Sequence, residues 1–140
     1  MKAPTLLMLV GLSISTAQAA EPTGTLTLAC QGMTKEIAPP LGAKPEPISM
    51  GIMLDFAART LEGFGSDVTF RIGIGNITET ALDFSGSNVS DLTRSYTYQI
   101  SGTMDRVTGT VEAVFTGSMK DGPRWSTGYS LQCKPTQRMF

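Results

Sequence analysis

Two carboxylates, Asp55 and Glu62, are the side chains that come nearest to an acid–base pair in this sequence. Two carboxyl groups on either side of a glycosidic bond can hydrolyse it, one as the acid and the other as the base or nucleophile. Each is isolated among weakly polar residues, however, which is more typical of a solvated strand face. The chain also lacks histidine, the usual general base near neutral pH. We therefore expect no catalytic residues and predict that the protein is not an enzyme.

The two cysteines, Cys30 and Cys133, are candidates for either a reactive thiol or a disulfide. A nucleophilic cysteine needs a neighbouring base to activate it, and a chain without histidine lacks the usual one. In an oxidising compartment two cysteines usually pair with each other. The sequence therefore predicts a structural disulfide between Cys30 and Cys133.

The segment Gly73-Ile74-Gly75 has the glycine spacing of a phosphate-binding loop. Such a loop needs a helix N-terminus directly after it, and no helical pattern follows here, so we interpret these residues as glycines near a strand end. The lack of histidine removes the commonest metal ligand, and we expect neither a metal nor a cofactor. The net charge is −1 and no basic stripe exists, which argues against nucleic acid as a partner. The expected partner is an unknown small molecule or protein.

Residues 1–19 are typical of a cleavable secretory signal peptide. Lys2 supplies the positive start, a short apolar run follows, and Ala17-Gln18-Ala19 is an A-x-A cleavage site. The alternative is a membrane anchor, but spanning a bilayer takes roughly 20 apolar residues, and polar residues interrupt this run from Ser13 onward. We expect cleavage after Ala19, a periplasmic or extracellular location, and no membrane association after cleavage.

Beyond residue 20, apolar and polar residues alternate with a period of two, which predicts β-strands. The composition agrees, because charged residues make up only 16% of the chain while Thr, Ser and Gly are plentiful. The apolar positions of the eight expected segments are Leu26, Leu28 and Cys30; Met50, Ile52, Leu54 and Phe56; the weaker segment Arg59–Phe64; Val68, Phe70, Ile72 and Ile74; Leu82 and Phe84; Tyr96, Tyr98, Ile100 and Met104; Val107, Val111, Ala113 and Phe115; and Trp125, Tyr129, Leu131 and Cys133.

About eight strands joined mostly by short turns predict an all-β, antiparallel up-and-down meander, closed as a barrel or folded as a sandwich. A chain of 140 residues has the size of one domain, here residues 20–140. Within it we expect a proline-rich loop near residues 38–47 and a short C-terminal tail at 134–140. A disulfide between the first and last strands requires these strands to be close, which favours the closed barrel.

The predicted apolar faces are rich in aromatic residues, namely Trp125, Tyr129, Tyr96, Tyr98, Phe70, Phe84 and Phe115. These rings can fill the core of a small barrel or line a cavity for an apolar ligand. The function that we predict is an exported, non-enzymatic binding or structural module. One alternative is a small outer-membrane β-barrel, suggested by the alternating strands and the terminal Phe140. Another is a periplasmic carrier of an apolar small molecule, or a protein inhibitor.

Four segments of the chain resemble a group of uncharacterised exported proteins of rhizobia and related alphaproteobacteria. They are Gly24-Thr25-Leu26-Thr27-Leu28-Ala29-Cys30, Lys44-Pro45-Glu46-Pro47-Ile48-Ser49-Met50-Gly51, Ile100-Ser101-Gly102-Thr103-Met104-Asp105-Arg106-Val107-Thr108-Gly109 and Cys133-Lys134-Pro135-Thr136-Gln137-Arg138-Met139-Phe140. The resemblance extends over most of the chain that follows the signal peptide. It implies an exported protein and no particular activity.

A second resemblance, of architecture only, is to the periplasmic inhibitors of C-type lysozyme. These are small exported barrels whose functional loop carries a Ser-Gly-x-x-Tyr pattern. In this chain Ser101-Gly102 is followed by Asp105 at the tyrosine position, and Ser85-Gly86 is followed by Val89. Because the tyrosine is missing from both, the resemblance does not carry the inhibitory role over to this chain.

Overall fold

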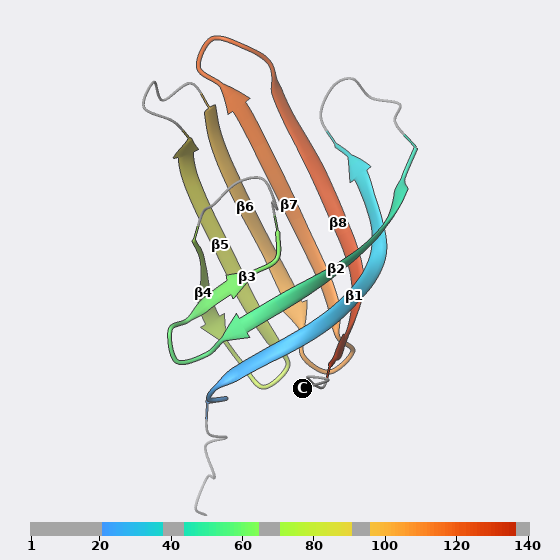
Figure 1. Cartoon of the computed structure of the whole chain (residues 1–140), viewed down its shortest axis with the longest axis vertical. Helices are drawn as coiled ribbons and strands as arrows, with labels where there is room; N and C mark the ends of the chain where they lie inside the picture. The colour runs from blue at the N-terminus through green and yellow to red at the C-terminus, as the bar shows by residue number, and fades with distance from the viewer. Residues whose placement is uncertain (1–20, 38–43, 65–70, 91–95, 137–140) are drawn as a thin grey trace, which may run out of the picture.

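The computed structural model describes residues 21–37, 44–64, 71–90 and 96–136. They form eight strands: β1 (Thr25–Glu36), β2 (Glu46–Asp55), β3 (Thr60–Glu62), β4 (Ile72–Ile77), β5 (Ala81–Ser90), β6 (Tyr96–Asp105), β7 (Thr110–Met119) and β8 (Arg124–Pro135). Each strand runs antiparallel to the next, and β1 also pairs with β8, so the sheet closes into an up-and-down barrel (Figure 1). The predicted all-β meander is confirmed, and it closes as a barrel. The predicted signal peptide lies outside the described residues.

The period-two pattern places one apolar face of each long strand inside the barrel, because successive side chains of a strand point to opposite sides. On β1, for example, Leu28 and Cys30 are buried, whereas Ala29 and Gln31 are exposed. The buried apolar residues form one core, made of Leu28, Cys30, Ile52, Leu54, Leu61, Phe64, Ile72, Ile74, Leu82, Phe84, Ile100, Met104, Val111, Ala113, Phe115, Leu131 and Cys133. Removal of this apolar surface from water is the main force that holds the barrel together.

The predicted disulfide joins Cys30 on β1 to Cys133 on β8, directly across the seam of the barrel. The two residues are register partners, and their Cα atoms are 4.0 Å apart. The backbone N–H of Cys133 donates to the carbonyl of Gly109 on the β7 side, so Cys30 and Cys133 form a non-hydrogen-bonded pair. In such pairs of an antiparallel ladder the side chains approach most closely, which suits a disulfide.

The β6–β7 turn differs from the prediction. Val107, expected on the inner face of the seventh strand, lies in the turn and is 75% exposed, and β7 begins only at Thr110. The reason is Asp105, whose Oδ1 accepts the backbone N–H groups of Thr108 and Val107 at 2.8 Å each. Aspartate favours this side-chain-to-backbone bonding in turns. The same bonds lower the pKa of the Asp105 carboxyl from its ordinary value, because they favour the charged form.

The third predicted strand, Arg59–Phe64, is shorter than expected, because β3 covers only three residues. Arg59 has a φ of 52° and belongs to the preceding turn. At Gly63, where φ is 131°, the backbone passes so near β2 that a Cβ atom would lie 2.3 Å from a carbonyl oxygen. Only glycine can adopt this backbone conformation so close to β2. The conformation directs the side chain of Phe64 into the barrel, where Phe64 is 5% exposed.

The C-terminal strand is longer than expected. The tail predicted at residues 134–140 begins later, because β8 continues to Pro135 and the backbone N–H of Thr136 still donates to the carbonyl of Thr27 at 2.9 Å. Since Thr136 and Thr27 are a hydrogen-bonded pair, the neighbouring pair of Pro135 and Leu28 is not. The proline therefore removes no hydrogen bond between β1 and β8, which explains why it does not end the strand.

The loop predicted near residues 38–47 also has different bounds. Its last two residues, Glu46 and Pro47, are already part of β2. Pro47 lies opposite Met33 of β1. At the start of the same ladder the backbone N–H of Phe56 donates to the carbonyl of Gly24, so these two residues are a hydrogen-bonded pair. Because hydrogen-bonded and non-hydrogen-bonded pairs alternate along an antiparallel ladder, the pair of Pro47 and Met33 is a non-hydrogen-bonded one. Residues 38–43 lie outside the described part of the chain, as do Val68 and Phe70 of the predicted fourth strand.

Candidate ligand-binding site

The two carboxylates considered for catalysis lie on the outside of the barrel. Asp55 ends β2, and its Oδ1 accepts the backbone N–H of Ala58 at 2.8 Å, which closes the β2–β3 turn. Glu62 is exposed and lies opposite Met53 in the register of β2 and β3. Each follows a buried leucine in its strand, Leu54 before Asp55 and Leu61 before Glu62. The two carboxylates therefore point outward, as expected for side chains on a solvated strand face.

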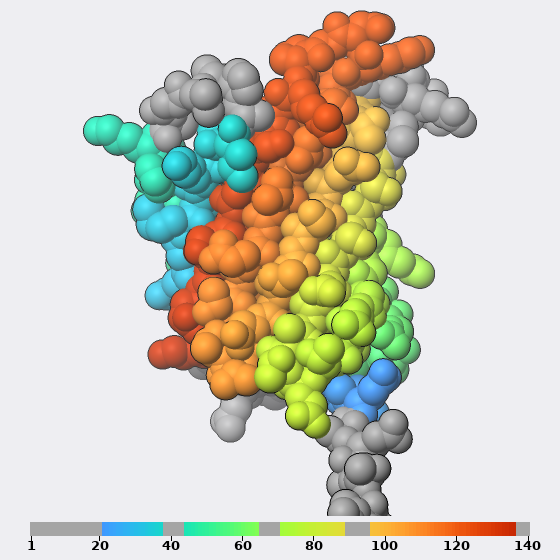
Figure 2. Space-filling model, turned by 180° about the vertical axis from the view of Figure 1, so that it is seen from behind, coloured from blue at the N-terminus to red at the C-terminus, as the bar shows by residue number. Residues whose placement is uncertain are grey.

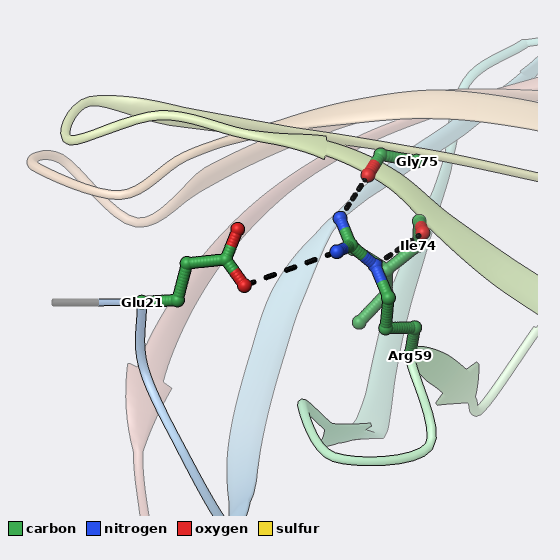
Figure 3. A network of polar contacts seen from close by, with 4 residues as sticks. All are labelled: Glu21, Arg59, Ile74 and Gly75. Atoms are coloured by element: carbon green, nitrogen blue, oxygen red, sulfur yellow. Dashed lines mark hydrogen bonds and ion pairs between the residues drawn. The ribbon is translucent and has the colours of Figure 1, made fainter.

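Gly73-Ile74-Gly75 lies within β4, and the described residues after it form strands and turns without a helix. The register with β5 shifts between Ile74 and Ile77. Figure 3 shows how Arg59 is bound at this irregularity: its guanidinium donates to the carbonyls of Ile74 at 3.5 Å and Gly75 at 2.5 Å. Glu21 lies 3.9 Å from the same guanidinium. The two carbonyls bind a side chain of the protein itself, which is a structural role.

The aromatic residues of the apolar face form two clusters inside the barrel. Toward the end of the barrel where β6 and β8 begin and β7 ends, the rings of Tyr98, Phe115 and Trp125 pack with centroids 5.5–6.1 Å apart. Trp125 lies against Gly117, where a Cβ atom would be 2.1 Å from the ring. Tyr96 stacks on Tyr98 at 6.3 Å, as expected for two residues of one strand face, but it is 36% exposed and does not belong to the buried core. It lies at the start of β6, where the barrel wall ends.

The second cluster fills the middle of the barrel and is organised by Phe64. Its ring stacks on Phe84 at 5.6 Å and meets Tyr129 edge-on at 5.2 Å. Burial raises the pKa of the Tyr129 phenol, because desolvation disfavours the charged form. These rings serve as core, whereas Phe70, also predicted for this face, lies outside the described residues.

An apolar cavity of about 250 Å³ opens at the lower end of the barrel in Figure 1, where β1 and β5 start and β2, β6 and β8 end. At this end most inward positions carry leucine or methionine, and Phe56 supplies the one aromatic ring of the lining. The apolar lining residues are Pro22, Leu26, Leu28, Leu54, Phe56, Leu82, Met104, Cys133 and Pro135. The turn that follows β6 adds Asp105, Arg106 and Gly109 at the mouth.

The size and lining of this lower cavity suit a small apolar molecule. An engineered cavity of about 150 Å³ lined by apolar side chains stays dry and binds benzene, and the space here is larger. Drug-sized ligands occupy pockets of about 300–1,000 Å³, so the cavity is matched to something smaller. Water inside it would find few polar partners, and its replacement by hydrocarbon is favourable.

A second hollow lies on the outer face of β5, β6 and β7, the face turned to the viewer in Figure 2. It measures about 540 Å³ and is lined by Ser85, Gly86, Ser87, Gln99, Ile100, Ser101, Val114 and Thr116. The two Ser-Gly pairs compared with the lysozyme-inhibitor pattern lie here, opposite each other within strands, since Ser85 pairs with Ser101. They do not form a loop.

The sequence identified most residues of the lower cavity as inward-facing but did not identify the cavity. It sought a binding space among the aromatic rings, and these pack against one another instead. The contributions of Pro22, Asp105, Arg106, Gly109 and Pro135 were missed. A usable signal existed, because the inward residues nearest the lower ends of β1, β5 and β6 are Leu26, Leu82 and Met104, and these side chains fill less space than aromatic rings.

The described residues contain no group of three or more potential ligands close enough to hold a metal ion. None of their segments is a helix with the length and hydropathy needed to cross a membrane. Comparison of the chain with protein-family models, curated proteins and solved structures found no match.

Proposed function

We propose that this chain is an exported, non-enzymatic binding protein that carries a small apolar molecule in the lower cavity. The observation that carries the proposal is the cavity itself, about 250 Å³ in volume, lined mostly by apolar side chains and open at one end of the barrel. Water in this open cavity would contact mostly apolar side chains, so its replacement by the hydrocarbon part of a ligand is favourable.

The disulfide supports a location outside the cytoplasm. Disulfides persist in oxidising compartments and are rare where cellular thiols keep cysteines reduced. The bond between Cys30 and Cys133 therefore agrees with the signal peptide predicted at residues 1–19. Both cysteines also belong to segments that resemble the exported alphaproteobacterial group, and we propose that the chain is a member of it.

The polarity of the outer face favours a barrel surrounded by water over the outer-membrane alternative. A membrane barrel presents an apolar band to lipid and a polar interior. Here the apolar side chains point inward, and the outward positions of β5–β8 are largely polar, with exposed Asp83, Ser85, Ser87, Gln99, Ser101, Thr103, Glu112, Ser130 and Gln132.

A cavity-filling variant tests the proposal. Leu26→Trp places a large ring in the lower cavity and is expected to weaken the binding of 1-octanol at least tenfold. The measurement is the rise of the thermal midpoint with 1-octanol concentration, because a ligand that binds only the folded state stabilises it. Met33→Trp is the matched control, since Met33 lies on the same strand but is 42% exposed. Equal stabilisation of both variants by 1-octanol would place the ligand outside this cavity.

A further inference from the structure

The mouth of the lower cavity carries one negative and one positive side chain, and their surroundings differ. Both Asp105 and Arg106 are among the lining residues. The Asp105 carboxylate already accepts two backbone N–H groups of its own turn, from Val107 and Thr108. The Asp105 carboxylate therefore stabilises the turn between β6 and β7.

Arg106 is held at the mouth by the neighbouring turn. Its backbone N–H donates to the carbonyl of Thr80 at 2.7 Å, and its Nη1 donates to the carbonyl of Thr78. These bonds tie the arginine to the turn between β4 and β5. A side chain that is already ordered loses less conformational entropy when it binds a ligand.

The Arg106 guanidinium keeps most of its hydrogen-bonding capacity. A guanidinium has five N–H donors, and within the part of the chain that the structure describes one contact, to Thr78, uses them. No carboxylate of the described residues lies within ion-pair distance of it. Arg59 differs, because its guanidinium bonds two carbonyls and has Glu21 at 3.9 Å. The remaining donors of Arg106 match the paired oxygens of a carboxylate.

We infer that the lower cavity binds an anionic amphiphile, a short unbranched carboxylate whose hydrocarbon chain enters the barrel while its carboxylate bonds to Arg106 at the mouth. This inference rests on the proposed function and specifies its ligand. A cavity of about 150 Å³ holds benzene, so the space of about 250 Å³ here admits a hydrocarbon group of at least that size. Octanoate is the probe that we choose for this class of ligand.

The two charges at the mouth should act in opposite directions on such a ligand. Arg106 attracts the carboxylate, and Asp105 repels it across the same rim. Asp105→Asn retains a side-chain oxygen for the turn but removes the negative charge. This variant is expected to bind octanoate severalfold more tightly than the unaltered protein.

Calorimetric titration with octanoate and with uncharged 1-octanol, in a buffer of about 0.01 M ionic strength, tests the inference. Arg106→Gln is expected to weaken octanoate binding about tenfold, since charge-assisted hydrogen bonds are the stronger kind, and to weaken 1-octanol binding much less, because a neutral hydroxyl forms no charge-assisted bond with Arg106. Lys134→Gln is the matched control: it makes the same charge change on β8, at an exposed residue that does not line the cavity. It should alter neither affinity.

The outcomes separate the inference from the proposed function. If octanoate and 1-octanol both bind, and Arg106→Gln affects them equally, the carboxylate assignment is overturned while the apolar carrier remains. If neither ligand binds the unaltered protein, the proposed function fails. Should Arg106→Gln fail to fold, the unaltered protein supplies the test. Raising the ionic strength to 0.15 M must then weaken the binding of octanoate and leave the binding of 1-octanol unchanged. The reason is that the Debye length, over which charges interact, falls from about 30 Å to about 8 Å.

Discussion

Replacement of both Cys30 and Cys133 with alanine is expected to lower the free energy of unfolding by about 4 kcal/mol. The bond closes a loop with a sequence separation of 103 residues, and in the chain-entropy model a loop of about 100 residues stabilises by about 4.7 kcal/mol. Native disulfides of small secreted domains contribute about 2–5 kcal/mol, so the expected value lies within the usual range. Urea denaturation, with the variant and the oxidised protein compared at equal pH, measures the difference.

The control for this prediction is the unaltered protein after reduction. Because the alanine variant and the reduced protein both lack the cross-link, their denaturation midpoints should agree closely. Thiol titration checks the bond itself. Two reactive thiols in the denatured protein, purified under oxidising conditions and before any reductant is added, would mean that Cys30 and Cys133 had not paired.

Phe64→Ala is expected to destabilise the barrel by about 3–5 kcal/mol, the usual cost of truncating a buried phenylalanine. Phe64 is 5% exposed and lies between Phe84 and Tyr129 in the middle of the barrel. Its removal leaves a cavity that the neighbouring strands cannot close, because their positions are fixed by hydrogen bonds around the whole barrel. Urea denaturation gives the magnitude.

Tyr96→Ala is the matched control for Phe64→Ala. Tyr96 also stacks on another ring, Tyr98, but it is 36% exposed at the start of β6. Its truncation should cost about 1 kcal/mol or less, as for most surface substitutions. Equal losses for the two variants would show that Phe64 does not organise the core.

Much of this fold could be predicted from alternation alone. A one-residue change of register moves every side chain of a strand to the opposite face, so the inward positions of β1, β2, β5 and β8 follow directly from their apolar residues. The pairing of β1 with β8 followed from the two cysteines. With residue 30 on the first strand and residue 133 on the last, a disulfide requires the sheet to close.

The errors arose where a single side chain or backbone angle decides the local structure. Val107 fits the alternation of β7, yet Asp105 binds its N–H group and moves it into a turn. Phe64 lies beyond the three-residue strand β3, and only the φ of 131° at Gly63 directs it inward. The C-terminal tail was expected to begin at residue 134, but β8 continues to Pro135, whose position in the ladder requires no N–H group. Periodicity carries no information on any of these features.

The lower cavity escaped prediction for a different reason. Its lining residues come from strands that are far apart in the sequence, from Leu26 to Pro135, and the empty volume depends on how their side chains meet. The order of residues along each strand predicts which side chains point inward. It does not predict whether they fill the space between them.

Methyl NMR during a titration with 1-octanol tests the binding site most directly. Met104 lines the lower cavity, whereas Met33 and Met119 are each 42% exposed, on the outside of β1 and at the far end of β7. We expect a saturable shift of the Met104 methyl signal, accompanied by the methyl signals of Leu26 and Leu54, with Met33 and Met119 unchanged. An unchanged Met104 signal at saturating 1-octanol, or a larger shift at Met119, would contradict the assignment of the lower cavity as the binding site.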